Sequence, residues 1–315
     1  MAGPVGPTKH HDEAAALAFQ QSGCCSSVEF ARAGNSSGRR RRMVMSLQLL
    51  RWLPLVLSLA ACTTRPSQLE RLARFTGADS SVFQVEYSEL DEELIPSLSS
   101  ALQGASEQVQ RWGGLSRPVR LLVHPDHASL ELAIGRPGFP WLRAWAQYRT
   151  IHLQSPRTWG IPYEGQLEEL LSHELTHVAM YQAVGGPEDW ERREVPLWFR
   201  EGMASVSAGQ GYRRGNEPDI AVFLSRERID PFAADEEVLR LHKDLVYSCS
   251  HWAFLFLLRQ HGGGEEEGTA RVRRLLQQLR EGIPFDRAFR DSWGMSEQEF
   301  LRRWQRHIGV QVPRS

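Results

Sequence analysis

Three residues in the segment LLSHELTHVAMYQ, positions 170–182, have the types and spacing of a metal site. His173 and His177 lie four residues apart, and Glu174 follows the first histidine directly. Residues four apart share one face of a helix, so both imidazoles can reach one zinc ion at about 2.0–2.1 Å. Glu174 would then stand beside the ion, where a carboxylate can take a proton from bound water. The spacing predicts a zinc site with two histidine ligands and Glu174 as general base.

A zinc site that activates water needs a third protein ligand and leaves the fourth position to water. Glu201 is the candidate, because it lies in the otherwise apolar helical segment PLWFREGMASV. A carboxylate in such a segment needs a cationic partner. The alternative is that Glu201 pairs with Arg200 or with another arginine on the helix surface. The acidic residues of the preceding loop are interpreted as solvated charges: Glu188, Asp189, Glu191 and Glu194.

The hydrophobic pattern predicts the elements that must position these residues. A helix over 166–186 carries the histidines, and a second helix from about Pro196 carries Glu201. Strands are expected over 82–88, 117–125 and 143–156, and a helix over 91–113. Four further helices are expected at 236–260, 269–281, 284–291 and 296–307. This order predicts a compact α+β fold, with a small N-terminal mixed sheet and helices followed by a helical C-terminal part.

The N-terminal region has the pattern of an export signal. Residues 39–62, RRRRMVMSLQLLRWLPLVLSLAAC, combine arginines, a short apolar run and small residues. The run is too short for a transmembrane helix, which needs roughly 20 apolar residues. Its end, LAAC, resembles the bacterial lipoprotein lipobox, and this resemblance implies that Cys62 carries the lipid anchor. The alternative is an ordinary signal peptide in which Cys62 is incidental.

These patterns divide the chain into three regions. Residues 1–61 are interpreted as a leader and lipoprotein signal peptide, with synthesis starting at Met43 or Met45. Residues 62–80 are interpreted as a membrane tether. Residues 81–312 form the zinc domain, with an α/β part at 81–160 and a helical part with the zinc site at 161–312. We expect a protein of the bacterial envelope, anchored in the outer membrane and facing the periplasm.

The remaining composition limits the function classes. The net charge of −1 gives no basic surface for nucleic acid, so no nucleic-acid partner is expected. The four cysteines are too few and too unevenly placed for a disulfide framework. Cys249 is interpreted as a buried small hydrophobic residue.

The motif HELTH, followed after a loop by WFREGMA, resembles the gluzincin zinc peptidases, the clan of thermolysin and aminopeptidase N. The match is closest to the small bacterial peptidase MA-like group, over roughly residues 82–308. This resemblance implies zinc on His173, His177 and Glu201, Glu174 as base, and a peptide or protein as substrate. It also implies that AWAQYRTIHLQSP, residues 144–156, is an edge strand along which the substrate backbone pairs.

The chain departs from that clan at three points. It has no G-x-M-x-N motif, so an aminopeptidase is not supported. The spacing of 24 residues between His177 and Glu201 is longer than in thermolysin, and the loop 185–195 is therefore a candidate wall of the cleft. Ser205 stands where thermolysin-like enzymes carry an aspartate that orients a ligand histidine. The residue that would do this here is left open.

The resemblance further implies a tyrosine or histidine that stabilises the oxyanion. Tyr247 is the first candidate, and the alternative is that it is a core tyrosine with a satisfied hydroxyl. His251 is the substitute candidate, one turn later on the same helix. Tyr212, in a Gly-rich loop, remains open, and His242 is interpreted as a surface residue.

Two other functions remain open at this point. One is a zinc-binding lipoprotein without hydrolytic activity, which acts as an envelope assembly or binding factor. The intact Glu174 argues against it. The other is a structural lipoprotein in which the H-E-x-x-H spacing is accidental.

Overall fold

The computed structural model describes residues 69–78, 80–160, 165–227, 229–232, 236–260 and 262–310. The predicted signal peptide and Cys62, the predicted acylation site, lie outside these residues. The described residues belong to one compact unit, Ala61–Ser315. Within this part of the chain, no helix combines the length and apolar character that a membrane span requires. The fold is mixed α+β, which confirms the predicted class.

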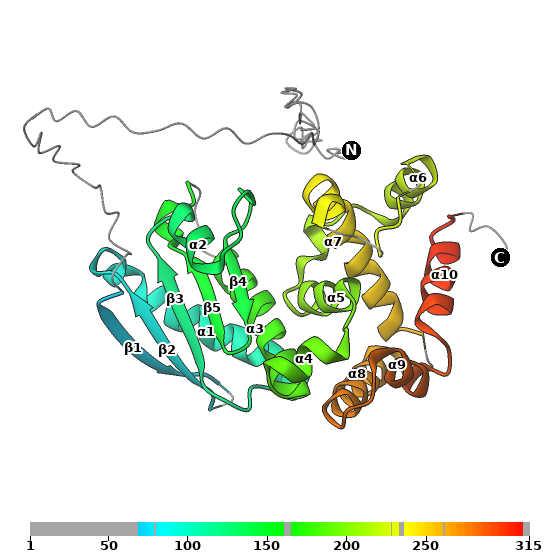
Figure 1. Cartoon of the computed structure of the whole chain (residues 1–315), viewed down its shortest axis with the longest axis horizontal. Helices are drawn as coiled ribbons and strands as arrows, with labels where there is room; N and C mark the ends of the chain where they lie inside the picture. Colours follow the sequence, from blue (N-terminus) through cyan, green and yellow to red (C-terminus); the bar gives the residue numbers. More distant parts are fainter. Residues whose placement is uncertain are drawn as a thin grey trace, which may run out of the picture. The chain divides into compact units, whose positions relative to one another are not determined.

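Five strands form one mixed sheet in the order β1-β2-β3-β5-β4 (Figure 1). The three central strands run parallel, and each edge strand pairs antiparallel with its neighbour. Phe83, Val85 and Tyr87 are buried at every second position of β2, the period of a strand with one face on a core. The strands are β1 (Arg71–Thr76), β2 (Val82–Tyr87), β3 (Val119–His124), β4 (Ala144–Gln147) and β5 (Thr150–Gln154).

Two expectations about the strands are wrong. The segment 143–156, predicted as one strand, is a hairpin in which β4 and β5 are joined at Tyr148 and Arg149. Tyr148 has a φ of 55°, in the left-handed region that tight hairpin turns use. The tether predicted for 62–80 is wrong for residues 71–76, because β1 pairs with β2 there. β1 is an edge strand with mostly exposed side chains, and its sequence therefore resembles that of a polar linker.

The two helices that carry the predicted metal ligands are confirmed within two residues of their expected ends. The segment 187–193, expected as loop, is the short helix α4. The helices are α1 (Ile95–Gln110), α2 (His127–Ile134), α3 (Gln166–Val184), α4 (Pro187–Arg193), α5 (Leu197–Ser207), α6 (Glu217–Glu227), α7 (Glu236–Leu258), α8 (Gly264–Arg280), α9 (Phe285–Trp293) and α10 (Glu297–His307). Short 3₁₀ turns are η1 (Glu89–Leu94), η2 (Pro156–Thr158) and η3 (Gln210–Arg213).

Helix α3 lies between two hydrophobic cores. Leu171 and Leu175 pack with α1 and one face of the sheet (Figure 1). Met180 and Val184, near the other end of α3, pack with the C-terminal helices. A helix covered on all sides buries its polar residues as well as its apolar ones. The elements around α3 therefore hold its H-E-x-x-H segment inside the protein.

Helix α5 crosses α7 at close range because residue 202 is glycine. A Cβ atom at Gly202 would overlap the backbone carbonyl oxygen of Ser250 and lie 2.5 Å from Cβ of Phe254. The absence of a side chain thus lets the helix that carries Glu201 pack directly on the helix that carries Tyr247.

Helix α7 is kinked at His242, where φ is −129° and ψ is 31°. This side chain is half-buried, and its ring centroid lies 6.1 Å from that of Phe223. His242 is therefore a half-buried residue that packs against α6 at the surface of the protein.

Candidate metal centre

His173, His177 and Glu201 bring three potential ligand atoms together. The two Nε2 atoms of the histidines are 3.2 Å apart. Glu201 places Oε2 3.3 Å from His173 Nε2 and Oε1 3.6 Å from His177 Nε2. Ligand atoms bound at about 2.0–2.1 Å to one tetrahedral ion are about 3.3–3.4 Å from each other. The three side chains thus have the spacing of ligands of one ion, and this group could hold a metal ion.

The surroundings of Glu201 favour this interpretation over a surface ion pair. Its side chain is 13% exposed, and among the described residues its ion-pair partners are His173 and His177 rather than Arg200. Burial by itself would raise the pKa of Glu201. The two histidines outweigh burial and hold the pKa well below its usual range. The carboxylate therefore stays charged inside the protein, where it requires a positive partner.

Gln210 orients His173 within the cluster. The amide oxygen of Gln210 accepts a hydrogen bond of 2.8 Å from Nη2 of Arg214 and lies 3.1 Å from Nδ1 of His173. A guanidinium can only donate, so Arg214 fixes which end of the amide faces it. The same oxygen must then accept the Nδ1 hydrogen of His173, which leaves Nε2 free to bind a cation. Gln210 thereby makes the supporting contact that the sequence left unassigned.

Glu174 lies between the cluster and the edge strand. The backbone N–H of Ala146 in β4 lies near enough to this carboxylate to lower its pKa. Burial raises the pKa of Glu174 to about 7, and the charge of Glu201 adds to this, whereas His173 and the Ala146 N–H oppose it. A buried carboxyl group with a pKa near neutrality can both accept and release a proton.

The register of the hairpin decides which backbone groups β4 presents to this site. Gln154 donates its N–H to the Arg143 carbonyl at 2.8 Å, and Ala144 pairs with Leu153 one residue later. In an antiparallel pair, alternate residues direct their N–H and C=O groups to the neighbouring strand. The backbone groups of Ala144 and Ala146 therefore point away from the sheet. The effect of the Ala146 N–H on the pKa of Glu174 agrees with this direction.

A pocket of about 290 Å³ adjoins the cluster, and His173, Glu174, Ala144 and Tyr247 lie in its wall. Tyr247 is half-buried, with the guanidinium of Arg214 5.4 Å from its ring centroid. Burial, together with the charges of Glu201 and Glu174, raises the pKa of Tyr247. Its hydroxyl therefore keeps its hydrogen and can act as a donor in the pocket.

His251, the substitute for Tyr247, supports the fold instead. It is buried, and its Nδ1 lies 3.0 Å from the hydroxyl oxygen of Ser205. Burial lowers the pKa of His251 to about 4, and the nearby charges of Arg214 and Arg259 add to this. The imidazole is neutral and joins α7 to α5, and it does not line the pocket beside the metal cluster.

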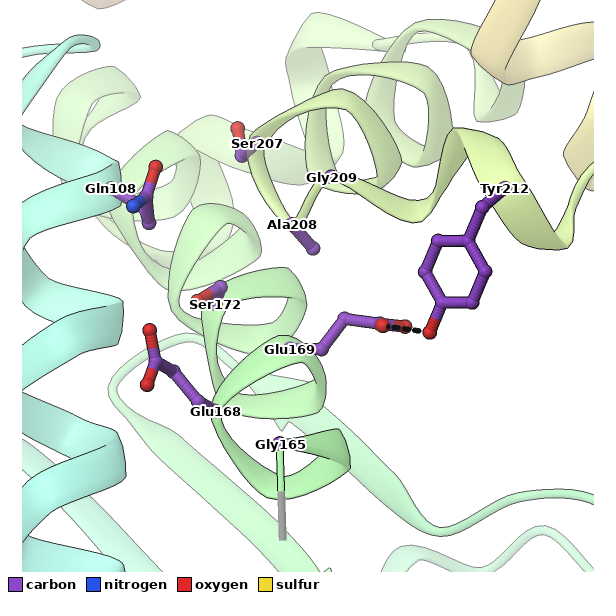
Figure 2. Close-up of a pocket in the computed structure, with 9 residues that line it drawn as sticks. All are labelled: Gln108, Gly165, Glu168, Glu169, Ser172, Ser207, Ala208, Gly209 and Tyr212. Atoms are coloured by element: carbon purple, nitrogen blue, oxygen red, sulfur yellow. Dashed lines mark hydrogen bonds between the residues drawn. The ribbon is translucent and has the colours of Figure 1, made fainter. Parts of the chain in front are cut away.

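Tyr212 faces a neighbouring pocket of about 340 Å³ (Figure 2). Its hydroxyl donates to Oε2 of Glu169 at 2.5 Å and accepts from Nε of Arg213 at 2.6 Å. Glu169 lines both pockets, so these three side chains form part of the partition between them. The hydroxyl hydrogen of Tyr212 is therefore engaged by Glu169, and Tyr212 is not among the residues that line the pocket beside the cluster.

The loop 185–195 was a candidate wall of the cleft. Gly185, Gly186 and Pro187 instead border a pocket of about 510 Å³ that Tyr148 and Tyr181 also line. Tyr181 follows His177 by four residues on α3. Burial raises the pKa of Tyr181, and the charges of Glu201 and Glu174 add to this. The helical spacing could have indicated Tyr181, whereas no pattern in the sequence indicated Gln210 or Arg214.

A comparison with protein-family models finds no match to this chain, and neither does a comparison with curated proteins. The site itself therefore carries the argument about function.

Proposed function

We propose that this protein is a zinc-dependent peptidase of the gluzincin type. One observation carries the proposal, namely the position of the Glu174 carboxylate between the metal cluster and the outward-facing backbone of β4. A metal site, a proton acceptor and a strand edge are the three parts needed to bind a peptide backbone and hydrolyse it. The mixed sheet followed by a helical part is also the order of elements expected for such a fold.

The donor set fits zinc. Two imidazole nitrogens and one carboxylate, on His173, His177 and Glu201, match the three-ligand type of catalytic zinc site. Zinc bound there would lower the pKa of a water molecule and polarise the carbonyl group of the substrate.

The remaining steps belong to residues of the chain. Backbone groups of Ala144 and the backbone carbonyl of Ala146 hold the substrate as an added strand, while the Ala146 N–H faces Glu174. Glu174 takes the proton from the attacking water and then delivers it to the leaving amine. Tyr247 donates its hydroxyl hydrogen to the oxygen that becomes negatively charged in the transition state.

The test compares metal content with hydrolysis. We expect the purified protein to contain a single zinc ion per chain and His177→Ala to lose it. Glu174→Gln keeps the size of the side chain and should keep zinc, while peptide hydrolysis falls by about 10²–10⁴-fold because the base is gone. Tyr247→Phe should also keep zinc and lose about 10²–10³-fold. Metal analysis and mass spectrometry of a peptide library measure both quantities.

The results distinguish a peptidase from a zinc-binding protein without hydrolytic activity. Hydrolysis by Glu174→Gln at the rate of the wild type would contradict the mechanism. Bound zinc without any hydrolysis by the wild type would instead favour the non-hydrolytic binding protein.

The location is a separate part of the proposal and rests on residues 39–62 alone. We propose that Cys62 is acylated and anchors the enzyme in the bacterial envelope, at the outer membrane facing the periplasm. Acyl chains contribute about 0.8 kcal/mol per buried CH₂, so several chains hold the protein firmly. Cys62→Ser should abolish lipid labelling and release or trap the protein, and unchanged membrane fractionation would contradict the anchor.

A further inference from the structure

The pocket beside the metal cluster is rich in positive charge. Four basic side chains line it: Arg143, Arg213, Arg214 and Lys243. Two of them are neutralised by neighbouring carboxylates, since Arg213 pairs with Glu169 at 3.2 Å and Lys243 pairs with Asp244 at 2.9 Å. The other two are Arg143 and Arg214.

Arg214 and Arg143 donate to neutral oxygens. Arg214 donates to the Ser205 hydroxyl at 3.3 Å and to the Gln210 amide at 2.8 Å, so it is held in place without an opposite charge. Nη1 of Arg143 lies 3.2 Å from the carbonyl oxygen of Pro140 and 3.1 Å from the Gln154 amide oxygen. Fixed guanidinium groups with neutral partners are suited to bind a carboxylate, for which their geometry is complementary.

The charge balance of a site that holds a divalent ion also favours a ligand with a carboxylate. A divalent ion offsets the two carboxylates, Glu201 and Glu174, and leaves Arg143 and Arg214 as uncompensated charges beside them. This step rests on the proposed zinc site. A substrate with a negative charge would restore the balance inside a pocket where burial strengthens the attraction.

We propose that this pocket selects peptides that carry a carboxylate near the bond to be cleaved, and that Arg214 and Arg143 bind this carboxylate. The carboxylate can belong to an acidic side chain or to the free C-terminus of the peptide, since the chemistry is the same. Arg143 immediately precedes β4, so it can reach the side chains of a peptide bound along that strand.

The test measures binding without turnover, with zinc-loaded Glu174→Gln protein and four peptides of equal length. One peptide is neutral with an amidated C-terminus, one carries a Glu with an amidated C-terminus, one carries a Gln in its place, and one is neutral with a free C-terminus. Calorimetry should give dissociation constants on the order of 10- to 100-fold lower for a peptide with a carboxylate. The Glu peptide and the free-acid peptide identify which source of carboxylate the pocket accepts.

Variants in the same Glu174→Gln background assign the effect to the two arginines. Arg143→Gln should remove most of the preference and leave the affinity for the neutral peptide unchanged. Arg214→Gln should also remove the preference. Because Arg214 fixes Gln210, which orients His173, the ratio of the affinities for the Glu and Gln peptides is the readout for this variant, and zinc content is measured beside it. Arg303→Gln, on the exposed face of α10, removes one positive charge outside the pocket and should keep the preference. Equal affinities for all four peptides, or a preference that survives in both pocket variants, would overturn the inference.

Measuring peptide hydrolysis by the wild type distinguishes a failure of this inference from a failure of the proposed function. Equal kcat/KM for neutral and carboxylate-bearing peptides contradicts the selectivity and leaves the peptidase intact. Arginine-dependent binding of the carboxylate without hydrolysis of any peptide supports the selectivity and contradicts the peptidase.

Discussion

Gln210 gives His173 a neutral hydrogen-bond acceptor. A carboxylate in that position would make the imidazole more basic and a stronger ligand, whereas an amide oxygen orients the ring with less effect on its charge. The hydrogen bond from Arg214 reinforces this, because it draws electron density from the oxygen that faces His173. The site therefore combines a well-oriented ligand with an expected metal affinity below that of a carboxylate-supported zinc site.

This argument predicts the effect of two substitutions on zinc affinity. Gln210→Leu removes the acceptor and should weaken zinc binding by about 10–100-fold. Gln210→Glu supplies a carboxylate at the same position and should strengthen binding. Competition with a chelator of known affinity measures both changes. Equal affinities in the wild type and the leucine variant would show that Gln210 does not position the ligand.

The sequence indicated the candidate ligands and the candidate base but not the residues that contact them. His173, Glu174 and His177 are related by helical spacing, which is a local property of the chain. Glu201 stood out as a carboxylate in an apolar segment. Gln210 and Arg214 reach the site from an irregular turn after α5, where no period relates a residue to its surroundings. Their roles depend on the tertiary contact between that turn and α3.

At the scale of elements, the packing of α5 on α7 sets the position of Glu201, the candidate third ligand. Gly202 directly follows Glu201 and touches Ser250 and Phe254 across the interface. A methyl group at this point would push α5 away from α7 and carry Glu201 with it. The distance between Glu201 on α5 and the two histidines on α3 would then change, and with it the space for an ion.

Gly202→Ala should therefore lower both stability and zinc affinity. Overpacking of a close helix contact costs about 1–3 kcal/mol in the free energy of unfolding. Gly262→Ala is the matched control, since a Cβ there meets no atom within 4 Å and should change stability little. Urea unfolding of the metal-free variants measures the first effect, and chelator competition measures the second. A Gly202→Ala protein as stable as the control would contradict the close packing.

The sequence predicted the long elements well and the short ones poorly. α3 and α7 have enough turns for an apolar pattern to show their helical period. The turn at Tyr148 and Arg149 contains none of the glycine, asparagine or aspartate residues that mark a tight turn, and the hairpin was therefore read as one strand. Helix α4 has only 7 residues and a charged sequence, so it resembles a loop. These short elements are stabilised by the packing around them rather than by local preference.

At the scale of the whole molecule, a second pair of histidines makes stability depend on pH. His124 Nε2 and His152 Nδ1 are 3.0 Å apart on neighbouring strands, and both side chains are buried. Burial, reinforced by His152, lowers the pKa of His124 to about 4, and burial also lowers the pKa of His152. In the unfolded chain a histidine has a pKa of about 6.5.

The sign of the effect follows from proton binding. Between about pH 6.5 and pH 4 the unfolded chain takes up a proton at His124 and the folded protein does not, and the lowered pKa of His152 acts in the same direction. Stability is therefore fully present above pH 6.5 and falls as the pH is lowered towards 4. We expect His124→Gln to reduce this slope in urea unfolding of metal-free protein, and the exposed His307→Gln to leave it unchanged. An identical slope in the wild type and His124→Gln would contradict the assignment.

The edge strand β4 is only 4 residues long. At a rise of about 3.3 Å per residue it offers about 13 Å of backbone, enough for a short segment of another chain. A polypeptide can occupy this edge only where its own N–H and C=O groups are not already engaged in a helix or a sheet. In native proteins such segments are exposed loops, chain ends and regions that open by local unfolding. Under the proposed function, access to the site thus depends on the conformational state of the substrate, and a protein would become susceptible at the segments that unfold first.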